Sequence, residues 1–233
     1  AIESEFVPVL VHNNKPGRDA EILKSFGEPA WNYQVIRFLN SEGEDIIPRR
    51  DQVWTVEAVA ARMVEALEKA DKNVPQYLRA LAGKKLAGNL KQAAFAMYCF
   101  WTGELKLGGI EGVLTTEAGW LAGSEVTLVA YDESVLPFQK LLQHAVAVDC
   151  ADQVFLAGKE ERVLVEKTRL KVGDLTADYR KASASDQKKQ IAGTIFEKID
   201  LSPMQATKVN VLARSRPEEA LKWLSPQQIS ALE

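Results

Sequence analysis

The amino-acid sequence predicts an α+β fold. Segments such as GVLTTEAGW and SEVTLVAYD alternate apolar and polar residues, which is typical of β-strands, and helical patterns lie between such segments. The clearest helix is VEAVAARMVEALEKA, whose apolar residues recur at i, i+3 and i+4 after Thr55, a preferred N-cap residue. With 233 residues, 46% of them hydrophobic, the chain is long enough for one large domain or two small ones.

Composition excludes several classes of function. The formal net charge is -3 and no long run of Lys or Arg occurs, so we expect neither a nucleic acid nor an anionic membrane as partner. The apolar stretches are shorter than the roughly 18 residues of a membrane span. Two cysteines and two histidines favour neither a disulfide framework nor a metal site, and we expect no cofactor. The chain begins at Ala1, which predicts a periplasmic or other extracytoplasmic location if a leader was removed and a cytoplasmic one otherwise.

Residues 1–82 are expected to hold a strand, a helix, a hairpin and a second helix, followed by a linker helix in the segment NVPQYLRALAGKKLAGNL (73–90). The Val-rich segment FVPVLVH (6–12) precedes the turn cluster NNKPG and predicts a buried strand. Asp19 is the expected N-cap of the helix AEILKSFG. The segments YQVIRFL and EDIIPR flank NSEG, which indicates a hairpin.

Residues 83–172 predict a second unit and residues 173–233 a helical tail. KQAAFAMY is expected to be a strand, residues 99–107 a helix, and LPFQKLLQHAVAV a helix with Pro137 in its first turn. QVFLAGKEERVLVEKTRL is read as another hairpin or strand pair. In the tail, SPMQ (202–205) and SPQQ (225–228) each place Ser, Pro and Gln as in a capping box, so both predict helix starts.

Cys99 lies where a strand is expected to end and a helix to begin. The free N–H groups and the positive end of a helix dipole favour a thiolate at such a junction. A free cysteine is also commonly a buried, inert, small apolar residue. The junction alone leaves both interpretations of Cys99 open.

The residues after Cys99 resemble the peptide methionine sulfoxide reductase A family. The resemblance is carried, in order, by CFWTGE (99–104), Gly112-Val113, Gly119-Trp120 with Gly123, Glu125-Val126, Tyr131-Asp132 and Leu141-Leu142, over about 60 residues. It implies a ferredoxin-like α/β sandwich for this unit. The element order over roughly residues 5–70 resembles the second half of a thioredoxin-like domain, a partial unit that lacks the redox motif of that family.

The resemblance implies a thiol-based redox protein. Cys99 would be the nucleophile that attacks a sulfoxide and becomes a sulfenic acid, and Phe100 and Trp101 would form the pocket for the methyl group. Glu125 would be the acid that protonates the sulfoxide oxygen, although a Glu near a strand start is otherwise usually solvated. Trp120 stands where the family has a catalytic Tyr, and it is either a substrate contact or a core residue.

Asp149 and Cys150 align with the family's HDP segment. Asp149 would then contact substrate, and Cys150 would resolve the sulfenic acid of Cys99 as a disulfide; alternatively Cys150 is a core residue at a helix end. A thioredoxin-type reductant or a methionine-containing protein is the expected partner.

The sequence departs from the family pattern in ways that favour a second hypothesis. Tyr98 and Thr102 replace glycines, Trp120 replaces the tyrosine, and the loop between Gly123 and Glu125 is absent. These changes deplete the proton donors that the reductase reaction needs. The chain is therefore either an oxidoreductase or a non-catalytic binding or assembly subunit on the same scaffold.

Overall fold

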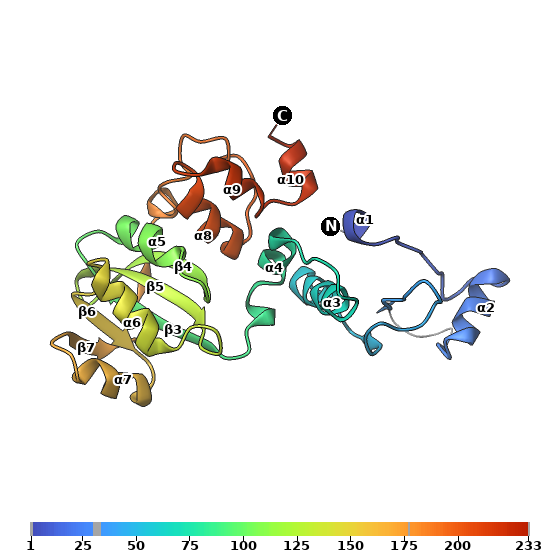
Figure 1. Ribbon diagram of the computed structural model, residues 1–233, viewed down its shortest axis with the longest axis horizontal. Helices are drawn as coiled ribbons and strands as arrows, with labels where there is room; N and C mark the ends of the chain where they lie inside the picture. Colours follow the sequence, from blue (N-terminus) through green and yellow to red (C-terminus); the bar gives the residue numbers. More distant parts are fainter. Residues whose placement is uncertain (1, 30–33, 177, 233) are drawn as a thin grey trace. The chain divides into compact units, whose positions relative to one another are not determined.

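The computed structural model describes residues 2–29, 34–176 and 178–232. The chain divides into two compact units, Ala1–Ala82 and Gly83–Glu233 (Figure 1). No helix in the described ranges is long and apolar enough to cross a membrane.

The N-terminal unit is built around two helices and a short hairpin. Its elements are α1 (Ile2–Glu5), α2 (Arg18–Ser25), β1 (Val35–Ile36), β2 (Arg50–Asp51), α3 (Val56–Lys69) and α4 (Gln76–Ala82). Thr55 caps α3, because its hydroxyl oxygen accepts a hydrogen bond from the backbone N–H of Ala58 at 3.2 Å. Phe38 and Ile47 of the hairpin pack with buried residues of α3 and α4, which gives this unit a core of its own.

The predicted strand at residues 6–12 is wrong. The segment forms no strand, and Val7, Val9 and Leu10 are 91%, 77% and 79% exposed. A Val-rich segment becomes a strand only where another strand pairs with it and buries its side chains. In the described residues of this unit, β1 pairs with β2 instead.

The predicted hairpin forms, but its pairing is short. Beyond β1 and β2, Leu39 and Asp45 form a single bridge beside the NSEG turn. The expected N-cap at Asp19 is wrong: α2 begins directly after Gly17, and the Asp19 carboxylate accepts a hydrogen bond from the backbone N–H of His12 at 3.3 Å. The resemblance of this unit to half of a thioredoxin-like domain stays a prediction.

The C-terminal unit is a six-stranded mixed sheet with helices, so the predicted α+β class is confirmed. The strand order is β7-β6-β3-β5-β4-β8, and only β6 and β7 are parallel neighbours. The elements are η1 (Gly83–Leu86), β3 (Leu90–Ala96), α5 (Phe100–Gly108), β4 (Val113–Leu121), β5 (Ser124–Asp132), α6 (Phe138–Ala147), β6 (Gln153–Leu156), α7 (Lys159–Glu166), β7 (Lys171–Asp174), β8 (Arg180–Lys181), η2 (Ala184–Asp186), α8 (Pro203–Leu212), α9 (Pro217–Leu221) and α10 (Pro226–Ser230).

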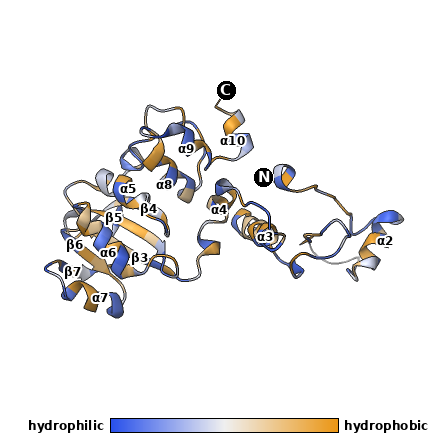
Figure 2. Ribbon diagram, viewed as in Figure 1, coloured by the Kyte–Doolittle hydropathy of each residue, from blue (hydrophilic) through white to orange (hydrophobic). Residues whose placement is uncertain are grey.

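The two faces of the sheet are covered differently. One face, lined by Phe95, Val129 and Tyr131, packs against apolar residues of α5, α6 and α7. The opposite face is covered by the chain that follows β7, through Leu175 and Tyr179. The strands of this sheet are coloured largely as hydrophobic in Figure 2, as expected when both faces are buried.

The predicted hairpin after residue 153 is wrong, because its second half is α7. The segment KEERVLVE contains good helix formers, and it buries Glu161 and Val165, which are four residues apart on one helical face. Parallel β6 and β7 also require a crossover connection, which a two-residue turn cannot provide.

The tail is not helical from Gly173 onward, because β7 and β8 add strands to the two edges of the sheet. Both predicted capping boxes do form, at the starts of α8 and α10. Their glutamines also contact each other: Gln205 Nε2 donates to Gln228 Oε1 at 2.9 Å. This reciprocal pair ties the two helix starts together around a small apolar cluster.

Asp132 ties the beginning of β3 to the end of β5. Its carboxylate accepts hydrogen bonds from the backbone N–H groups of Gly88, Asn89 and Ser134 at 2.9–3.0 Å, and from the Ser134 hydroxyl at 2.6 Å. Burial alone would raise the pKa of Asp132, but these hydrogen bonds outweigh it and lower the pKa from 3.8 to about 2.

We expect Asp132→Ala to lower the free energy of unfolding at pH 7 by about 1–3 kcal/mol, because three backbone donors lose their acceptor. Since the pKa is lowered in the folded state, this contribution is present above pH 3.8 and is lost as the pH falls through about 2. Urea unfolding from pH 7 to pH 2 measures both effects. Asp152→Ala, at an exposed position, is the control, and equal losses in the two variants would contradict the assignment.

Lys208 of α8 holds the C-terminal end of α5. Its ammonium donates to the carbonyl oxygen of Gly108, the last residue of α5, at 2.8 Å and to that of Ile110, just beyond the helix, at 3.3 Å. Burial lowers the pKa of Lys208 from 10.5 to about 8, and Glu111 opposes this only in part.

As the pH rises from about 8 to 10.5, Lys208 is neutral in the folded protein but still protonated in the unfolded chain. We therefore expect the unfolding free energy of the wild type to increase over this range, by up to roughly 3 kcal/mol. Lys208→Met should remove that gain, while Lys222→Met, at an exposed position, should keep it. Denaturant midpoints at pH 7.5 and pH 10 give the comparison. If the denaturant midpoints of the wild type and Lys208→Met change equally between the two pH values, the assignment to Lys208 is refuted.

Candidate functional site

Cys99 lies at the junction of β3 and α5. It is the N-cap residue of the helix, with an extended backbone (φ -146°, ψ 117°), and its carbonyl oxygen accepts the first helical hydrogen bonds, from Thr102 and Gly103. Its thiol makes no capping hydrogen bond and is partly exposed. The sequence therefore places the cysteine correctly, with its sulfur beside the first turn of a nine-residue helix.

Glu125 supplies the cap that the thiol does not. Its carboxylate accepts a hydrogen bond from the backbone N–H of Phe100 at 2.9 Å, the first N–H of α5. The strand register brings it there, because the backbone carbonyl of Glu125 accepts a hydrogen bond from Met97 at the end of β3. A carboxylate at a helix N-terminus is stabilising, so this contact also fixes the helix start.

A two-residue turn places Trp120 opposite Glu125. The turn consists of Ala122 (φ 50°) and Gly123 (φ 77°), and these positive φ values are those of a type I′ hairpin. Trp120 and Glu125 are consequently cross-strand partners in β4 and β5. The short turn thus brings a large aromatic side chain next to the carboxylate.

Phe100 lies at the centre of an aromatic cluster. Its ring packs edge to face against Trp101, with centroids 5.9 Å apart, and against Trp120, at 5.6 Å. Phe100 is buried together with Ala118 and Ala182, whereas Trp120 remains 37% exposed. Of the three aromatic residues expected to bind substrate, Trp120 is the one that offers the most accessible surface to a ligand.

The polar edge of Trp101 is occupied by the tail. Its indole N–H donates to the backbone carbonyl oxygen of Asp186 at 3.0 Å, and the ammonium of Lys189 lies 4.7 Å from the centre of its ring. Sequence reasoning missed both tail residues, because nothing local indicates a contact between positions more than 80 residues apart.

Sequence reasoning also missed a buried ion pair beneath the cluster. The fully buried carboxylate of Glu104 accepts a hydrogen bond from the backbone N–H of Lys188 at 2.7 Å and is ion-paired with the Lys188 ammonium. That ammonium also donates to the carbonyl oxygen of Thr116 at 2.6 Å. Burial lowers the pKa of Lys188, and the charge of Glu104 opposes this shift. The pair joins α5, β4 and the tail.

Cys150 and Asp149 lie at the end of α6. Cys150 is buried in the core between the sheet and the helices, its thiol lies 3.5 Å from the Val148 carbonyl oxygen, and burial raises its pKa. Asp149 is exposed, with φ 55°, in the left-handed conformation that ends helices. Both cysteines are free thiols, so the resolving role of Cys150 and the substrate contact of Asp149 stay predictions.

The site has the parts needed for thiol chemistry: a partly exposed cysteine, a carboxylate bonded to the first N–H of the helix that this cysteine caps, and an accessible aromatic surface. In the described part of the chain, no group of three or more His, Cys, Asp or Glu side chains could hold a metal ion.

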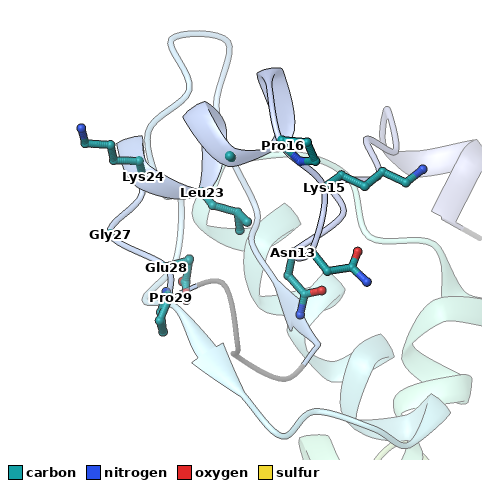
Figure 3. A pocket seen from close by; sticks show the side chains of 10 residues that line it. Asn13, Lys15, Pro16, Leu23, Lys24, Gly27, Glu28 and Pro29 are labelled. Atoms are coloured by element: carbon teal, nitrogen blue, oxygen red, sulfur yellow. The ribbon is translucent and has the colours of Figure 1, made fainter.

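Two open hollows lie in the N-terminal unit and contain none of these residues. The larger has a volume of about 650 Å³ and lies beside α2 (Figure 3); it is lined by Asn13, Asn14, Lys15, Pro16, Ala20, Leu23, Lys24, Gly27, Glu28 and Pro29. The other, of about 500 Å³, lies between the hairpin and α3. Neither lining includes a cysteine or a histidine, so the thiol site is the stronger candidate.

Comparisons with known proteins give a partial structural likeness. No family model matches the sequence, and the search of curated proteins found no match. The structure is similar to methionine sulfoxide reductase A of Corynebacterium diphtheriae, with a TM-score of 0.39 and 15% identity over 47% of this chain and 77% of that one. It is also similar to Mxr1 from Saccharomyces cerevisiae in an unusual oxidized form, with a TM-score of 0.34 and 14% identity over 42% of this chain and 78% of that one. Over part of its length the chain thus has divergent structural neighbours of the methionine sulfoxide reductase A type.

Proposed function

We propose that this protein is a thiol-based redox protein that reduces a methyl sulfoxide at Cys99. The observation that carries the proposal is the contact between Glu125 and the first N–H of α5, which holds a carboxylate at the helix turn where the partly exposed thiol of Cys99 lies. A nucleophile and a proton donor must meet at one point for this reaction.

In the proposed reaction, the sulfur of Cys99 forms a bond to the sulfoxide sulfur while Glu125 protonates the sulfoxide oxygen. The protonated oxygen then moves to the Cys99 sulfur as this sulfur–sulfur bond breaks, so the substrate leaves as a thioether and Cys99 becomes a sulfenic acid. A thiol of a reductant then displaces water to form a mixed disulfide, and a second thiol releases Cys99. Because Cys150 is buried, an external thioredoxin-type dithiol is the better source of these thiols.

Trp120 is the proposed contact for the methyl group. It keeps exposed surface beside Glu125, while Phe100 supports its ring from below. An apolar methyl group gains by leaving water for such a surface, so Trp120 would orient the sulfoxide with its oxygen toward Glu125.

A second function, binding without turnover, is favoured because groups that the reaction would need already contact other parts of the protein. Phe100 is covered by Ala182, and the indole N–H of Trp101 is already bonded to the tail. Glu125 is engaged as a helix cap. A methionine side chain could then rest on Trp120 with no reaction at Cys99.

Thiol accessibility gives the first prediction for the site. We expect iodoacetamide to modify Cys99 in the folded protein, and hydrogen peroxide to give a sulfenic acid there that dimedone traps, whereas Cys150 should react only after unfolding. Peptide mass spectrometry distinguishes the two sites. A folded protein in which Cys99 resists both reagents would eliminate the redox proposal and leave the binding function.

The role of Glu125 gives the second prediction. Glu125→Gln keeps an oxygen that can accept the hydrogen bond from Phe100 but loses the acidic proton, so stability should stay near the wild type while sulfoxide reduction falls about 100-fold or more. Glu125→Ala should also lose roughly 1 kcal/mol of stability with the cap.

The assay is the conversion of N-acetyl-methionine sulfoxide amide to its thioether with dithiothreitol, and Cys99→Ser is the inactive control. Unchanged turnover in Glu125→Gln would show that Glu125 is a cap and not an acid. Binding of the sulfoxide with no turnover in the wild type would favour the second function.

A further inference from the structure

Residues 182–189 lie along the edge of β4 that β8 leaves open, and Ala182, Gln187 and Lys188 bond to it. The backbone N–H of Ala182 donates to the carbonyl oxygen of Ala118 at 2.9 Å. The amide side chain of Gln187 pairs with both backbone groups of Ala118, donating to its oxygen at 2.8 Å and accepting from its N–H at 3.1 Å. Gln187 therefore takes the place of a neighbouring strand at this position.

The same eight residues are held to α5 by polar contacts. The backbone carbonyl of Asp186 accepts the Trp101 indole N–H, and Lys188 contacts the Glu104 carboxylate through both its backbone N–H and its ammonium. At the start of the segment, Ala182 is buried in one apolar cluster with Phe100. The segment thus spans from β4 to α5 and covers the inner half of the aromatic cluster.

Several features of this segment are those of an element that opens locally. Its one buried residue is Ala182, and its only regular structure is the three-residue η2. Lys188 has φ 48°, a left-handed conformation that is unfavourable for a lysine and that its contacts with Glu104 must hold in place. Few apolar contacts and strained backbone mark the regions of a fold that open before the rest.

We propose that residues 182–189 are a strap that opens and closes over Phe100 and Trp101, and so controls whether these two rings join Trp120 in accepting an apolar side chain beside Cys99. The structure is the closed state. When the strap opens, the Phe100 ring and the Trp101 edge become available together with Trp120. The role of the strap in substrate access rests on the proposed function. Its opening does not, because it requires no reaction at Cys99.

Hydrogen exchange tests the opening without any chemistry at the thiol. We expect the amides of the strap, among them those of Ala182 and Lys188, to exchange at least about 100-fold faster than the β4 and β5 amides. Their exchange rates should also depend less on denaturant, because a local opening exposes less surface than unfolding of the sheet. Gln187→Ala should speed strap exchange about tenfold and also speed exchange at the Ala118 amide, which loses its acceptor, while the other β4 and β5 amides stay unchanged. Gln143→Ala, on the exposed face of α6, is the matched control.

Labelling of Cys99 tests the consequence. N-phenylmaleimide carries an apolar ring that can pack against the exposed aromatic rings when the strap is open, whereas iodoacetamide has no such ring. Gln187→Ala should raise the rate with N-phenylmaleimide at least fivefold and change the rate with iodoacetamide by less than twofold. The proposal is overturned if strap amides exchange only when the whole sheet unfolds, or if the ratio of the two rates equals that of the wild type. Neither readout depends on sulfoxide turnover, so failure of the proposed function is seen separately.

Discussion

The free edge of β4 is the constraint on which the site depends. Backbone N–H and C=O groups at a sheet edge need partners when they are buried, and β8 pairs only with the last part of β4. Side chains of the tail complete the edge: Thr207 accepts from the N–H of Thr116, Lys188 donates to the Thr116 carbonyl, and Gln187 bonds both groups of Ala118. Since α5 packs on β4, the tail also holds the helix that carries Cys99.

The segment that pairs with the edge of β4 therefore also limits access to the aromatic cluster. This segment contacts α5, where Lys188 forms a buried ion pair with Glu104 and Ala182 covers Phe100. A buried ion pair costs much of its Coulombic energy in desolvation, so it contributes more to fixing the position of the tail than to net stability. Lys208 adds a second tie at the other end of α5. The helix is therefore held at both ends by residues from beyond the sheet core.

Local signals explain what the sequence could predict. Strands β3, β4 and β5, helices α3, α5 and α6, and both capping boxes are marked by periodicity or by N-cap residues within a few positions of each element. The failures are elements whose state is decided at long range. Residues 6–12 have the composition of a strand but no partner strand, and α7 is required by the parallel pairing of β6 and β7. The contacts between Glu104 and Lys188 span 84 residues and leave no local pattern.

The candidate site combines one half that is predictable with one that is not. Trp120 and Glu125 are cross-strand partners fixed by a two-residue turn, and Cys99 is the N-cap residue of α5, so these three residues lie on elements that local sequence patterns predict. Phe100 and Trp101 depend on the tail. The redox and binding functions share the first half, because both need an apolar group to rest on Trp120. They differ in whether Glu125 can also act as an acid while it caps α5, since one carboxylate oxygen must then accept from the helix while the other carries the proton. Glu125 has two oxygens and one of them bonds Phe100, so the geometry leaves the second for that task.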